Sequence, residues 1–136
     1  MIAILLNDAS FEQDIRELLM AFYPGETFTH KEEEAGEADL IVRGVRDGNS
    51  FSLDVTPVKK DAVHFALIYP DFSNRFETKN EIKQTLYRLL SAQTGRELPW
   101  GTLTGIRPTK IALTKLYDGW TDEQIETYMR ETYFTS

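Results

Sequence analysis

One segment of the sequence combines residue types that could bind an anion. It covers residues 100–110 and reads Trp-Gly-Thr-Leu-Thr-Gly-Ile-Arg-Pro-Thr-Lys, with two glycines four positions apart. Proline favours the first turn of a helix, and Arg107 and Lys110 place cations beside the free backbone N–H groups of such a helix start, where a carboxylate or phosphate could bind. The candidate binding or interface residues are Trp100, Gly101, Thr104, Gly105, Arg107, Thr109 and Lys110.

A structural role explains the same segment. Trp100 and Ile106 could fill a core, the two glycines could form turns, and Arg107 could pair with a local acid. Loops of this composition are common, and only the general attraction of a helix start for anions supports binding. The residues taken alone therefore favour the structural role.

Other arrangements typical of catalysis or metal binding are missing. The sequence contains no cysteine, which excludes disulfides, thiol catalysis and thiolate-held zinc or iron–sulfur sites within these residues. His30 and His64 are far apart and lack partners at zinc-ligand spacing. The serines form no Gly-x-Ser-x-Gly motif, and phosphate-binding glycine motifs are absent. We expect no catalytic residue, no metal site and no cofactor in this chain.

Composition places the chain among ordinary globular proteins. It has 136 residues, of which 41% are hydrophobic and 27% are charged. Its apolar runs are far shorter than the roughly 20 residues that cross a bilayer, and the amino terminus has no basic leader. We expect a cytoplasmic protein without membrane contact. The net charge of −7, with 12 acids and 4 bases in residues 1–54, argues against nucleic-acid binding.

The first elements along the chain are predicted as a strand, a helix and a hairpin. Residues 2–6 form an apolar run typical of a buried strand. Ser10 and Gln13 predict a capping box for a helix whose apolar residues recur until Pro24. The acidic stretch of residues 31–37 lacks the ligand spacing of a calcium loop and is expected to be a solvated loop.

Alternating residues then indicate an antiparallel meander. Residues 39–46 and 50–58 flank Asp47-Gly48, a dipeptide suited to a tight hairpin turn. Residues 63–69 predict another strand. Val63, Phe65, Leu67 and Tyr69 should share one face of this strand, opposite Ala66 and Ile68.

Three helices are expected in the remainder. Thr78 with Glu81 predicts a capping box for a helix that ends at Gly95, Pro108 opens a shorter helix, and Thr121 with Gln124 caps the last. This order predicts an α+β fold in which a strand-helix unit precedes an antiparallel meander, with helices packed on one face of the sheet. Residues 1–95 would form the sheet part and residues 96–136 the loop and two short helices, together in one compact domain.

The 100–110 segment resembles the signature of HemZ-type oxygen-independent coproporphyrinogen III oxidases. In that family the amino-terminal domain ends with Trp-Gly-x-Leu-Thr-Gly-Ile-Arg-Pro-Thr-Lys, and this sequence matches every specified residue. The preceding Gln93-Thr94-Gly95 and the following Leu116, Gly119 and Glu123-Gln124 agree in spacing. Residues 1–80 resemble the family in layout only.

The resemblance implies a larger parent enzyme of porphyrin and heme biosynthesis. In the family a barrel domain follows, and its Cys-x-x-x-Cys-x-x-Cys motif holds a [4Fe–4S] cluster that cleaves S-adenosylmethionine, so that a radical starts oxidative decarboxylation of coproporphyrinogen III. This chain has no cysteine and departs from that pattern. Tyr133 and Phe134 bring apolar bulk close to the last residue, so we expect a fragment of such an oxidoreductase, non-catalytic by itself.

Two roles for the chain remain open. It could be an interaction module that packs on the radical S-adenosylmethionine barrel of the same polypeptide through residues 100–110. It could instead bind carboxylates of a tetrapyrrole or another anion through Arg107 and Lys110, also as a free-standing binding protein. RNA binding is the weakest alternative, because no aromatic residues are interleaved with a basic patch.

Overall fold

The structure is a computed structural model that describes residues 1–58, 63–98, 101–102 and 114–134. The chain divides into two compact units, Met1–Arg96 (unit 1) and Glu97–Ser136 (unit 2). The predicted helix that starts at Pro108 begins outside the described residues.

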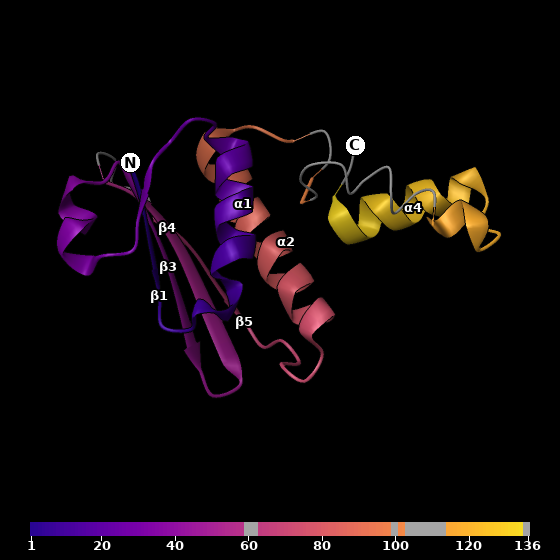
Figure 1. Cartoon of the computed structure of the whole chain (residues 1–136), viewed down its shortest axis with the longest axis horizontal. Helices are drawn as coiled ribbons and strands as arrows, with labels where there is room; N and C mark the ends of the chain where they lie inside the picture. Colours follow the sequence, from indigo (N-terminus) through magenta and orange to yellow (C-terminus); the bar gives the residue numbers. More distant parts are fainter. Residues whose placement is uncertain (59–62, 99–100, 103–113, 135–136) are drawn as a thin grey trace. The chain divides into compact units, whose positions relative to one another are not determined.

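Unit 1 contains a five-stranded mixed sheet in the order β2-β1-β3-β4-β5 (Figure 1). The first strand, β1, is parallel to both of its neighbours, whereas β3, β4 and β5 form an antiparallel meander. The strands are β1 (Ile2–Leu6), β2 (Phe28–Thr29), β3 (Leu40–Asp47), β4 (Ser50–Pro57) and β5 (His64–Ile68). The predicted α+β fold, a strand-helix unit followed by a meander, is confirmed. The two-residue β2 was not predicted.

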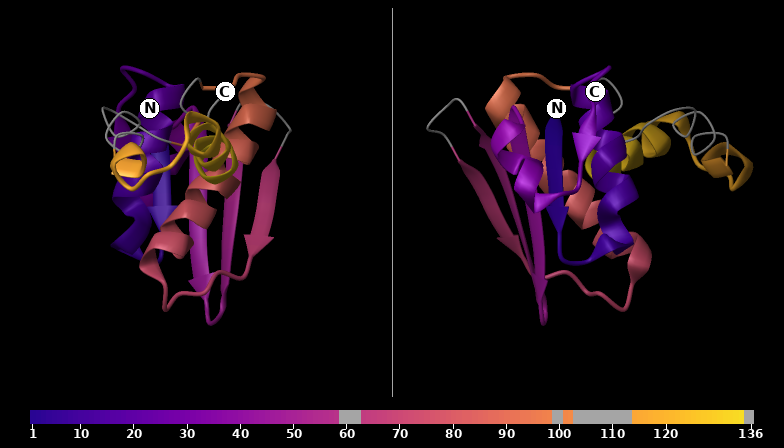
Figure 2. Two further views of the ribbon diagram at one scale, coloured as in Figure 1. Left: turned by 90° about the vertical axis from the view of Figure 1, so that its right-hand side faces the viewer. Right: turned by 60° about the vertical axis from the view of Figure 1, so that its left-hand side comes forward.

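Two helices, α1 (Glu12–Phe22) and α2 (Arg75–Thr94), lie on one face of this sheet and bury their apolar sides there (Figures 1 and 2). Phe22 on α1 contacts Tyr87 on α2 edge to face, with ring centroids 5.4 Å apart. Full burial of each large apolar side chain stabilises the fold by about 1.5–3 kcal/mol. The largest fully buried side chains are Phe22, Phe51, Ile2, Ile4, Ile15, Leu18, Leu19, Leu53, Ile82, Leu86, Leu90 and Val42.

The predicted starts of both helices are wrong by up to one turn. Asp8, not Ser10, is the first cap: its carboxylate accepts from Ser10 N–H at 3.0 Å and starts a short 3-10 turn, η1 (Ala9–Phe11), ahead of α1. Asn74 caps α2 by accepting from Glu77 N–H at 3.1 Å. Thr78 is buried inside the first turn and donates to backbone carbonyls instead. A better cap earlier in the chain took precedence in each case: Asp8 lies two residues before Ser10, and Asn74 lies one turn before Thr78.

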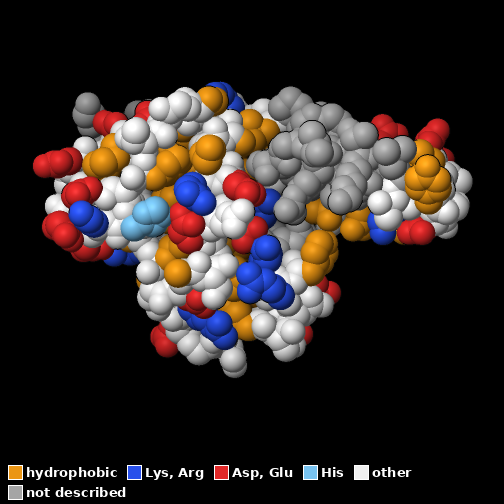
Figure 3. Space-filling model, viewed as in Figure 1, with side chains coloured by type: hydrophobic (Ala, Val, Ile, Leu, Met, Phe, Trp, Pro, Cys, Tyr) orange, Lys and Arg blue, Asp and Glu red, His pale blue; other side chains and the backbone are white. Residues whose placement is uncertain are grey.

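The acidic stretch expected to be a loop forms a 3-10 helix, η2 (Glu32–Glu37). Its Ala35 is buried with Ala3 and Leu5 on the sheet face opposite α1, because the small side chain lets the turn approach β1 closely. The glutamates stay solvated, and Figure 3 shows acidic side chains gathered over this part of unit 1.

The hairpin and the last strand follow the predicted alternation. Gly48 has φ +60° in the β3–β4 turn, a value that glycine adopts without strain. In β5, Phe65 and Leu67 point to the face opposite α2 and are exposed, whereas Ala66 lies on the helix-covered face opposite Leu53. The larger apolar row of β5 therefore faces outward.

Unit 2 is built around α4 (Asp122–Tyr133). The predicted capping box is confirmed: Gln124 N–H donates to the Thr121 hydroxyl at 3.1 Å, and Thr121 N–H donates to the Gln124 side chain at 2.9 Å. One apolar side of α4 buries Ile125, Met129 and Tyr133, with Trp120 and Tyr128 packed against them.

Candidate functional site

Of the seven predicted binding or interface residues, Gly101 lies within the described part of the chain. Trp100, Thr104, Gly105, Arg107, Thr109 and Lys110 lie outside it. Gly101 has φ +58°, and its N–H donates to the Leu98 carbonyl at 3.0 Å. A Cβ at this position would meet the Tyr133 carbonyl oxygen and would lie 2.6 Å from the Phe134 carbonyl oxygen. Glycine is therefore required by both conformation and space.

The next residue, Thr102, is fully buried and fixes the start of the segment to the end of α4. Its N–H and its hydroxyl both donate to the Tyr133 carbonyl, at 2.7 and 3.2 Å. The last carbonyls of a helix have no partner within the helix, so Thr102 satisfies one of them. Sequence reasoning missed this contact, because a lone threonine in a loop has no distinguishing pattern. Gly101 and Thr102 thus have a structural role.

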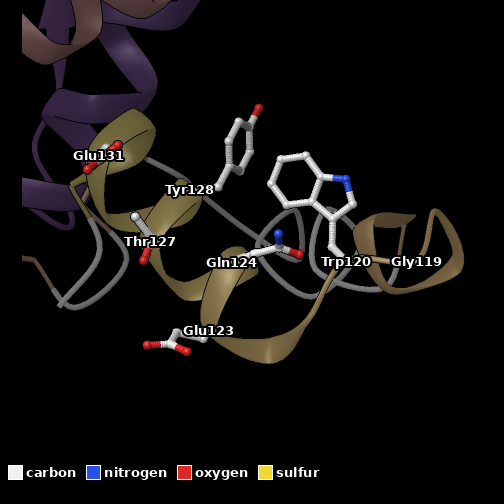
Figure 4. A pocket seen from close by; sticks show the side chains of 7 residues that line it. All are labelled: Gly119, Trp120, Glu123, Gln124, Thr127, Tyr128 and Glu131. Atoms are coloured by element: carbon white, nitrogen blue, oxygen red, sulfur yellow. The ribbon is translucent and has the colours of Figure 1, made fainter.

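An aromatic hollow of about 740 Å³ lies along α4 (Figure 4). The rings of Trp120 and Tyr128 meet edge to face with centroids 5.4 Å apart, and Figure 4 shows both on the same side of the helix. Lys115 Nζ lies 4.6 Å from the first centroid and 4.7 Å from the second, a cation–π arrangement. The lining residues are Gly119, Trp120, Glu123, Gln124, Thr127, Tyr128 and Glu131.

The lining of this hollow is mixed in character. Among its seven described lining residues are two aromatic rings, Trp120 and Tyr128, and two carboxylates, Glu123 and Glu131. The cation that an aromatic pair would attract is already supplied by Lys115. Trp120 and Tyr128 both pack against the buried side of α4, and the helical spacing gave no sign that a tryptophan before the cap would join it.

A second hollow of about 220 Å³ lies at the carboxyl end of β1 in unit 1, where α1 leaves on one face of the sheet and η2 on the other. Ligands of open α/β sheets bind at such switch points. Here, however, the polar groups pair with one another. His30 Nε2 lies 2.9 Å from Glu12 Oε1, and Arg43 donates to both oxygens of Glu32 at 2.9 and 3.3 Å.

These internal pairs also set the electrostatics of the sheet. The hydrogen bond with Glu32 raises the pKa of Arg43. Burial raises the pKa of Asp54, opposite Arg43 on the neighbouring strand, against the attraction of that cation. Hydrogen bonds from Ser10 lower the pKa of Asp8. The charged groups of unit 1 named here are thus committed to local pairs and caps.

Side-chain clustering and helix length bear on metal binding and on membrane spanning in the described ranges of the chain. In these ranges no group of three or more His, Cys, Asp or Glu side chains could hold a metal ion. Among the helices so described, none is long and apolar enough to cross a membrane.

Comparison with known proteins confirms the family resemblance predicted from residues 100–110. The chain is similar to the oxygen-independent coproporphyrinogen-III oxidase-like protein HemZ of Bacillus subtilis (strain 168), with 37% identity over 73 residues. The matched region covers 52% of this chain and 15% of that relative. No family model matches the chain, and no solved structure matches it.

Proposed function

We propose that the chain is the non-catalytic, amino-terminal accessory domain of a larger radical S-adenosylmethionine protein of the coproporphyrinogen III oxidase type. The observation that carries the proposal is the similarity to HemZ, of which this chain matches only a small part. The residues 100–110 that match the family signature support the same assignment.

The donor set of this chain does not fit the cofactors of such an enzyme. A [4Fe–4S] cluster is held by cysteine thiolates in these proteins, and the sequence contains none. We therefore assign the cluster, S-adenosylmethionine and the oxidative decarboxylation to the remainder of the parent polypeptide. The part described here would contribute contacts and positioning.

The test compares three proteins after anaerobic reconstitution with iron and sulfide: this chain, the full-length parent and the parent without residues 1–96. We expect iron–sulfur absorbance and S-adenosylmethionine cleavage in the two longer proteins and neither in the chain alone. Cleavage by the chain alone, or a parent reading frame without a Cys-x-x-x-Cys-x-x-Cys motif, would contradict the proposal.

For residues 100–110 the proposal is more specific. Arg107 and Lys110 contact carboxylates of a tetrapyrrole or a similar anion, because the sequence predicts a helix start at Pro108 and two cations beside such a start would attract negative charge. The anchoring of Gly101 and Thr102 on the end of α4 supports this, since it gives the segment a fixed starting point. Packing on the barrel domain is the competing use of the same residues.

A further inference from the structure

We infer that β5 is a pairing edge through which two copies of the chain join their sheets, antiparallel and edge to edge. In the described part of the chain β5 is the last strand of the sheet and pairs with β4 alone (Figure 2). The opposite side of an edge strand presents backbone N–H and C=O groups that another strand can use. This inference does not depend on the proposed function.

The edge lacks the features by which proteins block such pairing. Natural edge strands carry charged side chains, prolines or bulges. Residues 63–69 read Val-His-Phe-Ala-Leu-Ile-Tyr and contain no Lys, Arg, Asp or Glu. The register with β4 runs without a bulge from Phe51 opposite Ile68 to Val55 opposite His64. The strand is therefore regular and uncharged.

Exposed apolar side chains follow this edge: Phe65 and Leu67 lie on the face of β5 opposite α2, and Val63 and Tyr69 flank the strand. Val63 is 62% exposed, Phe65 60%, Leu67 47% and Tyr69 70%. Contiguous exposed apolar surface of this kind marks interaction sites, in contrast to isolated apolar side chains. Asp54 on β4 lies opposite Phe65 and, on its other side, opposite Arg43 on β3.

The occupant that this row fits is a second copy. When two β5 strands pair antiparallel about Ala66, Phe65 lies opposite Leu67 of the second copy, and the same register continued beyond the strand ends brings Val63 opposite its Tyr69. Each apolar side chain then lies opposite another apolar side chain, and the two-fold axis repeats every such pair once on its other side. A strand from an unrelated protein would need its own row of apolar side chains at the same spacing to pair equally well. The chain has a net charge of −7, but residues 63–69 contain no Lys, Arg, Asp or Glu. Pairing of the two strands therefore brings no like charges directly opposite each other.

The first experiment measures the mass of the chain in solution from micromolar to near-millimolar concentration. We expect a monomer–dimer equilibrium. Phe65→Lys and Leu67→Lys should each raise the dimer dissociation constant at least about tenfold, because every substitution enters the interface twice. The matched control is Phe76→Lys on α2, where the phenylalanine is 58% exposed. This variant should dimerise like the unchanged protein.

The second experiment identifies the register. Since the natural sequence has no cysteine, Ala66→Cys gives one thiol per chain, and the two thiols face each other across the two-fold axis. Mild oxidation should cross-link this variant as a dimer. His64→Cys should stay uncross-linked, because its two thiols would be separated by four residues along the strands, roughly 14 Å, too far for a disulfide.

Three results would overturn the inference. They are a monomer at every concentration, a dimer that Phe65→Lys and Phe76→Lys affect equally, and equal cross-linking of the two cysteine variants. Circular dichroism of each variant checks that the fold is kept, which the exposure of the substituted phenylalanines favours.

Discussion

Replacement of Gly101 by alanine should unfold the α4 part of unit 2. Two costs add at this position. The positive φ of +58° costs an alanine about 1–2 kcal/mol. The new Cβ would also meet the backbone of Tyr133 and Phe134, and overpacking of this kind costs about 1–3 kcal/mol. A unit of only about 40 residues has little stability to lose.

Gly119→Ala is the matched control for this substitution. Gly119 has φ +86°, but a Cβ there would meet nothing within 4 Å. The control therefore has the conformational cost of about 1–2 kcal/mol without the steric one. The difference between the two variants isolates the contact of Gly101 with the end of α4.

Tryptophan fluorescence gives a readout specific to unit 2. The two tryptophans of the chain, Trp100 and Trp120, both belong to residues 97–136. In urea titrations we expect the Gly101→Ala transition at much lower denaturant than that of Gly119→Ala, or red-shifted emission already in buffer. If both variants unfold at the same urea concentration, the packing of Gly101 against the end of α4 is wrong.

Three further predictions concern single residues. Thr121→Ala removes one half of the capping box and should lower the stability of α4 by about 0.5–2 kcal/mol in the same fluorescence titration. Its control is Thr127→Ala, in the middle of the helix and away from the cap, which should have a smaller effect. Asp8 has a lowered pKa in the folded chain. Its ionised carboxylate therefore stabilises the fold above the unfolded pKa of about 3.9, and this stabilisation is lost as pH falls through the folded pKa. Asp8→Asn should flatten the acid limb of a stability curve measured by circular dichroism, and an unchanged limb would refute the capping role of Asp8. Arg107→Ala should weaken binding of a porphyrin carboxylate and reduce its salt dependence, while Lys83→Ala on α2 should not; equal affinities would exclude the anion role.

Local signals in the sequence were enough to predict much of the fold. The Asp47-Gly48 turn with alternating flanks predicted the β3–β4 hairpin, and Thr121 with Gln124 predicted a capping box that the structure contains. These features depend on residues close together in sequence, where turn and capping chemistry decides the conformation.

Features that depend on competition or on distant contacts were missed. Thr78 and Asn74 are both good caps, and the sequence does not rank them, whereas burial of the threonine does. The two residues of β2 are too few to show alternation, and their pairing with β1 follows from the path of the chain after α1. Alternation in β5 predicted two faces but not which one meets the helices.

The candidate site was predictable only at the level of motif. The family signature identified residues 100–110, yet the partner of its first glycine is the carboxyl end of α4, more than 30 residues away. Thr102 and Tyr133 are joined through a backbone carbonyl, and a backbone acceptor leaves no trace in residue types. A motif of this kind shows that a segment has a use without showing what it contacts.

Polar groups in unit 1 pair with one another at the switch point of its sheet. At the switch point of its sheet, where an enzyme would place free acids and bases, His30 lies against Glu12 and Arg43 holds Glu32. Groups that are committed to each other this way shape and stabilise a surface but have little left to offer a substrate. The exposed row of β5, in contrast, has unused apolar surface. At the switch point of unit 1 the polar groups thus pair with one another, whereas the apolar row of β5 is open to contact with another protein surface.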